Sequence, residues 1–191
     1  MVFSSLIFIF IFLPLVLISY YVAPKRLRNT IILLASLIFY AWGEPIYIVL
    51  IIISILINYL GALLIRVHIN NKEKSKFIFI TILLIDISIL FFFKYYGFAI
   101  ESLGSIIGSD LKVKTIALPL GISFYTFQIL SYIIDIYRGN VKVQTNLPNF
   151  ALYVTMFPQL IAGPIVQYAD VDEQLASREV SRTKFGEGSM Y

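Results

Sequence analysis

The chain has 191 residues, of which 59% are hydrophobic and 14% charged, and its formal net charge is +4. Soluble domains usually carry about 25% charged residues, so the composition indicates an integral membrane protein. The chain contains no cysteine and one histidine, which excludes disulfides, thiol chemistry and a multi-histidine metal site within it. Basic residues occur in short groups between apolar segments and therefore indicate membrane topology, and no nucleic-acid-binding motif is present.

Five apolar segments are predicted to be helices in the membrane. They cover about residues 2–22, 29–42, 45–66, 77–96 and 118–138. About 20 helical residues are needed to cross the hydrocarbon core, so the segment 29–42 is short for a full span. We expect Pro14 to kink the first helix. Gly43, Glu44 and Pro45 should form a turn, with the next helix beginning at Pro45.

The basic groups predict which ends of these helices face the cytoplasm. Lys25–Arg28 and Arg66–Lys76 should both be cytoplasmic, which leaves the N-terminus outside. Gly97–Ala117 has the composition of an exposed loop and is expected on the outer side. His68 lies in the second basic group and is interpreted as a solvated loop residue, with a catalytic or metal-binding role as the alternative.

Asp86 lies near the middle of the segment 77–96. Acidic residues inside a membrane are rare and are usually functional or paired. No basic residue lies three or four positions away, so a partner must come from another segment; Lys94 could serve if the helix is distorted. Two interpretations remain: a hydrogen-bonded or protonated structural residue, or a residue that lines a tunnel or handles protons. A stripe of small and polar residues on 45–66 is expected to serve helix packing: Ser54, Asn58, Gly61 and Ala62.

The segment 118–138 has two different faces when it is placed on a helix at about 100° per residue. One face carries Gly121, Phe124, Tyr125, Gln128, Ser131, Tyr132 and Asp135. The other carries Ile122, Leu130, Ile133 and Tyr137. A lipid-facing Asp at a helix centre costs about 2.5 to 3.5 kcal/mol, so the polar face should meet protein or water. The pattern fits either a helix bonded to its neighbours or a helix that lines a functional cavity, and Asp135 can pair with Arg138.

The next apolar segment, about 149–165, is predicted to be broken. Asn149 is a plausible cap, and the pairs Phe157-Pro158 and Gly163-Pro164 interrupt the helix. A broken helix at membrane depth is tolerated only where protein or a water-filled cavity satisfies the freed backbone groups. Residues 157–165 are therefore predicted to be a re-entrant element beside a site, and 168–191 a polar tail. The fold class predicted is all-α: a polytopic transmembrane helical bundle with a re-entrant or broken segment.

Two segments carry a family resemblance, LPLGISFYTFQILSYIIDIYRG at 118–139 and FPQLIAGPI at 157–165. Together with YAWGEP at 40–45 and FFKYYGF at 92–98, they resemble membrane-bound O-acyltransferases of the bacterial alginate O-acetyltransferase type. The resemblance implies that 1–191 is the N-terminal part of such a domain in a bacterial cell membrane. The positions that match the wall of the family's tunnel are Gln128, Tyr132, Asp135, Gln159, Gly163 and Pro164.

The resemblance also implies a reaction. An acetyl group would move from a cytoplasmic donor, with acetyl-CoA expected as acyl donor and no bound cofactor, towards an extracellular polysaccharide or peptidoglycan. An extracytoplasmic acetyl-relay protein would be the partner. The family's catalytic histidine lies beyond position 191, so no catalytic residue is assigned here. The alternatives are a transporter or channel subunit, which would use the broken helix and Asp86 for passage, and a non-catalytic membrane scaffold.

Overall fold

The computed structural model describes residues 5–107, 117–163 and 166–176, and every regular element within these ranges is a helix. The all-α prediction is thus confirmed for the described part. The elements are the π-helix η1 (Phe8–Phe12), α1 (Leu13–Val22), the 3₁₀-helix η2 (Lys25–Leu27), α2 (Arg28–Gly43), α3 (Ile48–Val67), α4 (Lys72–Ile107), α5 (Ile122–Arg138), α6 (Leu147–Thr155), α7 (Phe157–Ala162) and α8 (Tyr168–Ala176).

Two of the described helices are long and apolar enough to cross a membrane. They are α3 and the part of α4 from Lys72 to Ser102. The stretch Phe8–Val22 is apolar but shorter, and α2 and α5 have 16 and 17 residues. The helices therefore fit a membrane protein, and a crossing by all five predicted spans remains a prediction.

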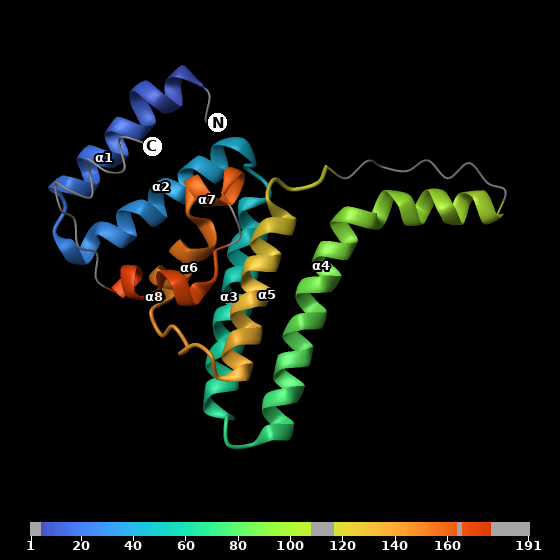
Figure 1. Cartoon of the computed structure of the whole chain (residues 1–191). Coiled ribbons are helices and arrows are strands. Elements are labelled where there is room, and N and C mark those ends of the chain that lie inside the picture. Colours follow the sequence, from blue (N-terminus) through green and yellow to red (C-terminus); the bar gives the residue numbers. More distant parts are fainter. Residues whose placement is uncertain (1–4, 108–116, 164–165, 177–191) are drawn as a thin grey trace.

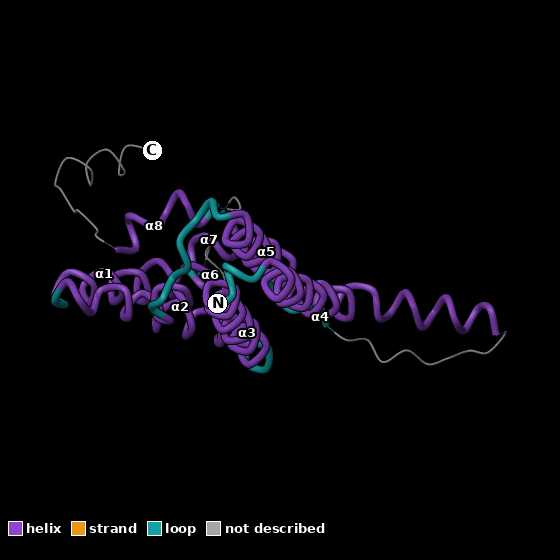
Figure 2. Tube along the Cα trace, turned by 90° about the horizontal axis from the view of Figure 1, so that it is seen from below, coloured by secondary structure: helices purple, strands orange, loops and turns teal. Residues whose placement is uncertain are grey.

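The helices α3, α4 and α5 lie side by side and form the bundle that positions the site (Figure 1). Seen along this bundle, α1 and α2 run across it on one side (Figure 2). The short helices α6, α7 and α8 fill the space between α2 and α5. As a result α5 is enclosed by helices from three directions.

The helix α4 is longer at both ends than the predicted span 77–96. The basic loop shrinks to a turn that ends at Asn71, whose Oδ1 accepts a hydrogen bond from the Lys74 amide at 3.1 Å and caps α4. The predicted loop Gly97–Ala117 is wrong for residues 97–107, which are helical. One glycine costs a helix only about 1 kcal/mol relative to alanine, so Gly97 does not end it. The last part of α4 bends away from the bundle (Figure 1).

Three helix starts differ from the predictions: α3 and α5 begin later than expected and α6 begins earlier. Residues 45–47 form a turn, so α3 begins at Ile48 and not at Pro45. Gly121 has φ +72°, which a helix cannot accommodate, so α5 begins at Ile122 and not at Leu118. Asn146, not Asn149, caps α6, since its Oδ1 accepts a hydrogen bond from the Asn149 amide at 3.1 Å.

The first helix changes geometry next to its proline. The π-helical turn η1 immediately precedes α1, and Pro14 occupies the first turn of α1. Proline removes a donor and crowds the preceding turn, and a π-turn relieves that crowding. Phe8 of η1 packs against Phe39 of α2 and Phe157 of α7, with ring centroids 5.5 and 6.0 Å away. This aromatic contact joins the first helix to the broken segment.

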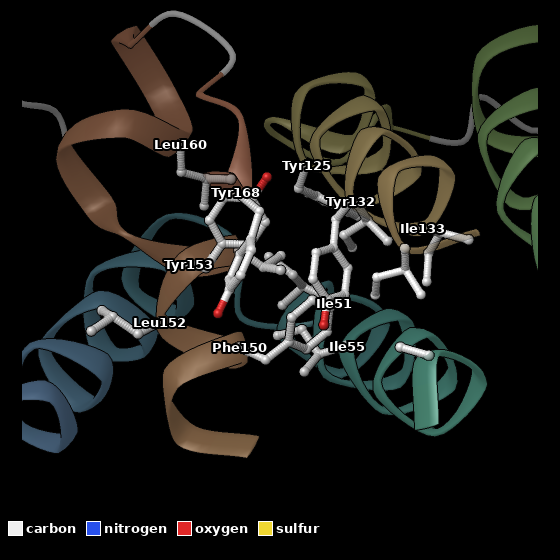
Figure 3. Packing of buried hydrophobic residues seen from close by; sticks show 14 of the residues in the cluster. Ile51, Ile55, Tyr125, Tyr132, Ile133, Phe150, Leu152, Tyr153, Leu160 and Tyr168 are labelled. Atoms are coloured by element: carbon white, nitrogen blue, oxygen red, sulfur yellow. The ribbon is translucent and has the colours of Figure 1, made fainter. Parts of the chain in front are cut away.

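The core is centred on α5 (Figure 3). On its polar face Tyr125, Gln128 and Tyr132 are buried, whereas Ser131 and Asp135 are only partly buried. The prediction that Ile122, Leu130 and Ile133 lie on a separate outer face is wrong, because they are 1%, 8% and 0% exposed. Contacts with α3, α4 and α6 leave only a narrow strip of α5 open, where Phe127 is 50% exposed. The helix is therefore a central element with little lipid-facing surface.

Candidate functional site

The broken segment predicted near residue 157 is present. The helix α6 ends at Thr155, α7 begins at Phe157, and Met156 between them has the non-helical angles φ −50° and ψ 112°. The Phe157 amide donates a hydrogen bond to Ser36 Oγ of α2 at 3.2 Å. A backbone donor freed at the break is thus satisfied by protein, as an interruption at membrane depth requires.

An apolar cavity of about 340 Å³ lies beside this break. It is lined by Leu13, Val16, Leu17, Tyr20, Tyr21, Ile32, Met156, Phe157 and Pro158. The walls come from α1, α2 and the start of α7. With this lining the cavity can hold a hydrocarbon chain but supplies few hydrogen-bonding groups.

Gln128 and Tyr153 connect α5 to α6 at the centre of the site. The Gln128 side chain is fully buried, and its Nε2 donates a hydrogen bond to the Tyr153 carbonyl at 2.8 Å. The Tyr153 hydroxyl in turn lies 3.3 Å from the Gln128 carbonyl and 3.1 Å from the Val166 carbonyl. Gln128 Oε1 is enclosed without a hydrogen-bond partner among the described residues. This leaves one strong acceptor available inside the protein.

Tyr132 forms the next layer along α5, where aromatic rings converge (Figure 3). Its ring centroid lies 4.9 Å from that of Phe150 and 4.8 Å from that of Tyr168. The Tyr132 hydroxyl accepts a hydrogen bond from the Gln144 amide at 3.0 Å, and the Gln144 side chain donates one to the Tyr168 hydroxyl at 2.8 Å. Tyr132 is therefore a packed and bonded wall residue, consistent with a role in positioning.

Gly121 allows α7 to approach the start of α5, and Gly163 allows a tight end to α7. A Cβ on Gly121 would lie 3.2 Å from the Leu160 carbonyl oxygen, in addition to the left-handed backbone angle at that position. Gly163 ends α7, and a Cβ there would lie 2.8 Å from Gln159 Cα. The Gln159 Nε2 atom is enclosed, and no acceptor for it is present in the described part of the chain.

The predicted site residues fall into separate groups. Gln159 and Gly163 lie near the start of α5, whereas Asp135 lies in its last turn, about 20 Å further along at 1.5 Å per residue. Asp135 accepts a hydrogen bond from Asn140 Nδ2 at 3.2 Å. The predicted ion pair between the described residues Asp135 and Arg138 is not formed. Pro164 lies outside the described residues. Gln128 and Tyr132 occupy the middle of α5.

Asp86 finds its partner on another helix, as the sequence required. Asn58 Nδ2 of α3 donates a hydrogen bond to Asp86 Oδ1 at 2.9 Å, and the two side chains are 0% and 3% exposed. Lys94 is exposed and lies over the Tyr95 ring instead. The Tyr125 hydroxyl of α5 is also enclosed without a partner among the residues described.

His68 lies in the turn after α3, where it is partly exposed and its Nδ1 is 3.0 Å from the Leu64 carbonyl. This agrees with the interpretation as a loop residue. Within the described ranges, no three residues of the types His, Asp and Glu lie together as metal ligands would.

Sequence reasoning did not identify several residues that build the site. Ser36, Tyr153, Gln144 and Tyr168 all hold it together through hydrogen bonds. Ser36 lies in an apolar helix and the tyrosines lie in apolar surroundings, so periodicity gave no signal for them. The sequence pattern places Asn58 on a packing face of its helix, but it does not identify Asp86 of α4 as the partner.

Comparison with known proteins tests the resemblance directly. The chain is 40% identical to a protein named probable alginate O-acetylase AlgI from Azotobacter vinelandii and 39% identical to one of the same name from Pseudomonas aeruginosa. In each case 98% of the chain is aligned. The resemblance is confirmed. A protein named peptidoglycan O-acetyltransferase from Helicobacter pylori is 32% identical over 93% of the chain.

The aligned region covers 38%, 37% and 39% of these three relatives, so the chain spans less than half of their length. No family model matches the chain, and no solved structure matches it. The similarity therefore bears on these residues as one part of the relatives, and the activity of a whole protein is a matter for proposal.

Proposed function

We propose that these residues form part of a membrane-bound O-acetyltransferase. In this proposal the helices make a multi-pass bundle, and α5 with the broken α6–α7 segment forms one wall of the path along which the acetyl group travels. The observation that carries the proposal is the 40% identity to an alginate O-acetylase over 98% of the chain. The names of the relatives favour acetyl transfer over transport.

The buried polar groups at this wall support the proposal. Gln128 Oε1 and Gln159 Nε2 are enclosed in apolar surroundings, and neither has a hydrogen-bond partner in the part of the chain that the structure describes. Leaving such a group unpaired costs about 1 to 3 kcal/mol. A structure bears this cost where a ligand, water or a further protein segment supplies the missing bond. Gln128 and Gln159 are accordingly proposed as lining residues.

The substrates in this proposal approach from opposite sides. Acetyl-CoA is the proposed acyl donor at the basic end of the bundle, where the Lys72–Lys76 group lies. The acceptor is a polysaccharide or peptidoglycan on the other side, reached with the help of an extracytoplasmic acetyl-relay protein. Acyl transfer to a hydroxyl needs a base or a nucleophile. We assign neither role to a residue of this chain.

The direct test measures transfer of radiolabelled acetyl from acetyl-CoA by membranes that contain either these 191 residues or the complete reading frame of the gene. A cognate relay protein and acceptor are included in both assays. Transfer by the complete product, but not by the 191 residues, is expected. Failure of both would contradict the proposal.

A pair of variants in the complete product tests the proposed wall. Gln128→Leu removes the enclosed acceptor and the bond to α6, so we expect transfer to fall at least 10-fold. Phe127→Leu changes the neighbouring side chain, which is 50% exposed, and should leave transfer unchanged. Equal rates in both variants, at equal protein levels in the membrane, would remove Gln128 from the path.

A further inference from the structure

A second cavity lies at the basic end of the bundle, far from the broken segment along α5. It has a volume of about 480 Å³ and is lined by Arg66, Ile69, Ile136, Gly139, Val141, Lys142, Val143 and Thr145. Its walls are the end of α3, the last turn of α5 and the connection from α5 to α6. In Figure 1 these three segments meet at the end of the bundle where α3 turns into α4.

The connection that forms one wall is held in place by hydrogen bonds. Gly139 adopts φ +78° and ends α5, and the Asn140 amide donates a bond to the Asp135 carbonyl at 2.9 Å. The Tyr59 hydroxyl of α3 donates a bond to the Thr145 carbonyl at 2.6 Å. Because the wall is attached to both α3 and α5, the cavity exists before any ligand enters it.

The two positive side chains that line this cavity are not neutralised by acidic side chains of the described residues. Arg66 and Lys142 are both exposed, and the structure shows neither in an ion pair with another described residue. The segments 66–76 and 135–142 together carry six basic residues against two acidic ones. Asp135, one of those two, is already bonded to Asn140. A bound anion would therefore meet two free cations.

Four of the remaining lining residues are aliphatic. Ile69, Ile136, Val141 and Val143 present hydrocarbon to the cavity. A ligand that matches both features carries a phosphate next to a hydrocarbon chain. Basic pockets at the ends of membrane helices bind anionic lipid headgroups in this way, and arginine can contact phosphate through two parallel hydrogen bonds.

We propose that this cavity binds an anionic phospholipid, with its phosphate between Arg66 and Lys142 and the upper part of its acyl chain on the four aliphatic side chains. The site is distinct from the proposed acetyl path and does not depend on it. Its lipid stabilises the α5–α6 connection and thereby the packing of α6 on α5.

The test compares lipid binding by the purified protein and by two matched double variants. Native mass spectrometry after reconstitution measures retention of phosphatidylglycerol and phosphatidylcholine. The wild type should retain phosphatidylglycerol preferentially. Arg66→Gln with Lys142→Gln should weaken that preference about 10-fold or more, since each basic residue near an anionic headgroup contributes about 1 kcal/mol. Lys72→Gln with Lys94→Gln removes the same charge from exposed positions outside the cavity and should retain it.

Three results would overturn the proposal. The first is equal retention of both lipids by the wild type, and the second is an equal loss of retention in the two double variants. The third is that no lipid is retained and that soluble coenzyme A binds instead, in a way that requires Arg66 and Lys142. A thermal unfolding measurement on each variant, in detergent without lipid, establishes that all of them are folded. The acetyl-transfer assay is a separate readout, so failure of either proposal can be recognised without the other.

Discussion

Asn58 of α3 donates a hydrogen bond to Asp86 of α4 at 2.9 Å, inside the bundle. The same Asn58 Nδ2 also lies 3.0 Å from the Ser54 carbonyl, which fixes the orientation of the amide. The pair joins the two described helices that are long enough to span a membrane. The acidic side chain therefore faces protein and not lipid, although Asp86 Oδ2 and Asn58 Oδ1 are enclosed without a partner among the described residues.

Replacing Asp86 with alanine should destabilise the bundle by about 1 to 3 kcal/mol, because the buried Asn58 amide loses its acceptor. Asp86→Asn keeps an acceptor in place and should cost less. Ile87→Ala, at a neighbouring position that is 49% exposed, is the control and should change stability little. The measurement is the free energy of unfolding in mixed detergent micelles. Equal losses for Asp86→Ala and Ile87→Ala would show that the hydrogen bond contributes nothing.

Gly61 and Gly97 provide a second pair of matched positions in helix interiors. A Cβ on Gly61 would overlap the Ile82 side chain of α4, whereas one on Gly97 would meet no atom within 4 Å. Gly61→Ala should therefore cost about 1 to 3 kcal/mol, and Gly97→Ala should stabilise by up to about 1 kcal/mol. Unfolding measurements also test the cause: Ile82→Ala should reduce the cost of Gly61→Ala. Additive effects of the two changes would contradict a direct contact.

The polar and small residues in the sequence predicted much of this packing. Gly61 and Asn58 were assigned to a packing stripe, and the interruption near Pro158 appeared where expected, because proline and glycine act locally on the backbone. The ends of α4 were not predictable in the same way. The polar composition of residues 66–76 predicted a loop. Lysine and glutamate are also compatible with a helix, and α4 begins directly after its cap Asn71.

The side-chain pairings were also beyond prediction from this sequence alone. Periodicity placed Gln128 and Asp135 on one face of α5, but only the packing of α6 shows that Gln128 is enclosed while Asp135 lies near the exposed end. The same holds for Ser36, since its role depends on the amide of Phe157 far along the chain. Helical spacing fixes the neighbours within a helix, and tertiary contacts decide which face is buried.

Ser36→Ala should destabilise the broken segment, because it removes the acceptor that the Phe157 amide uses at the break. The expected cost is about 1 to 2 kcal/mol, the range for a buried donor left unpaired. Thr81→Ala, whose exposed hydroxyl bonds back to the Phe77 carbonyl on α4, is the control and should be nearly neutral. Proteolytic cleavage between α6 and α8 should be faster in Ser36→Ala only. An unchanged cleavage rate would mean that water replaces the hydroxyl.

Tyr168 should make stability fall at alkaline pH. Burial, together with the neighbouring Asp172 carboxylate, raises the pKa of Tyr168 well above its ordinary value of about 10. Above about pH 10 the unfolded chain loses this proton while the folded protein keeps it, so the free energy of unfolding decreases as pH rises. Tyr168→Phe should decrease the slope of thermal stability against pH above 10. An unchanged slope would show that the residue does not contribute.

The topology can be tested with single cysteines, because the chain has none of its own. Asn70 is exposed in the turn between α3 and α4, and Ile46 is 80% exposed at the opposite end of α3. Ser75 is a poor reporter, since it is 6% exposed within α4. The charge distribution predicts that a membrane-impermeant maleimide labels Ile46→Cys in intact cells and labels Asn70→Cys only after permeabilisation. The reverse pattern would invert the bundle and place the basic cavity outside.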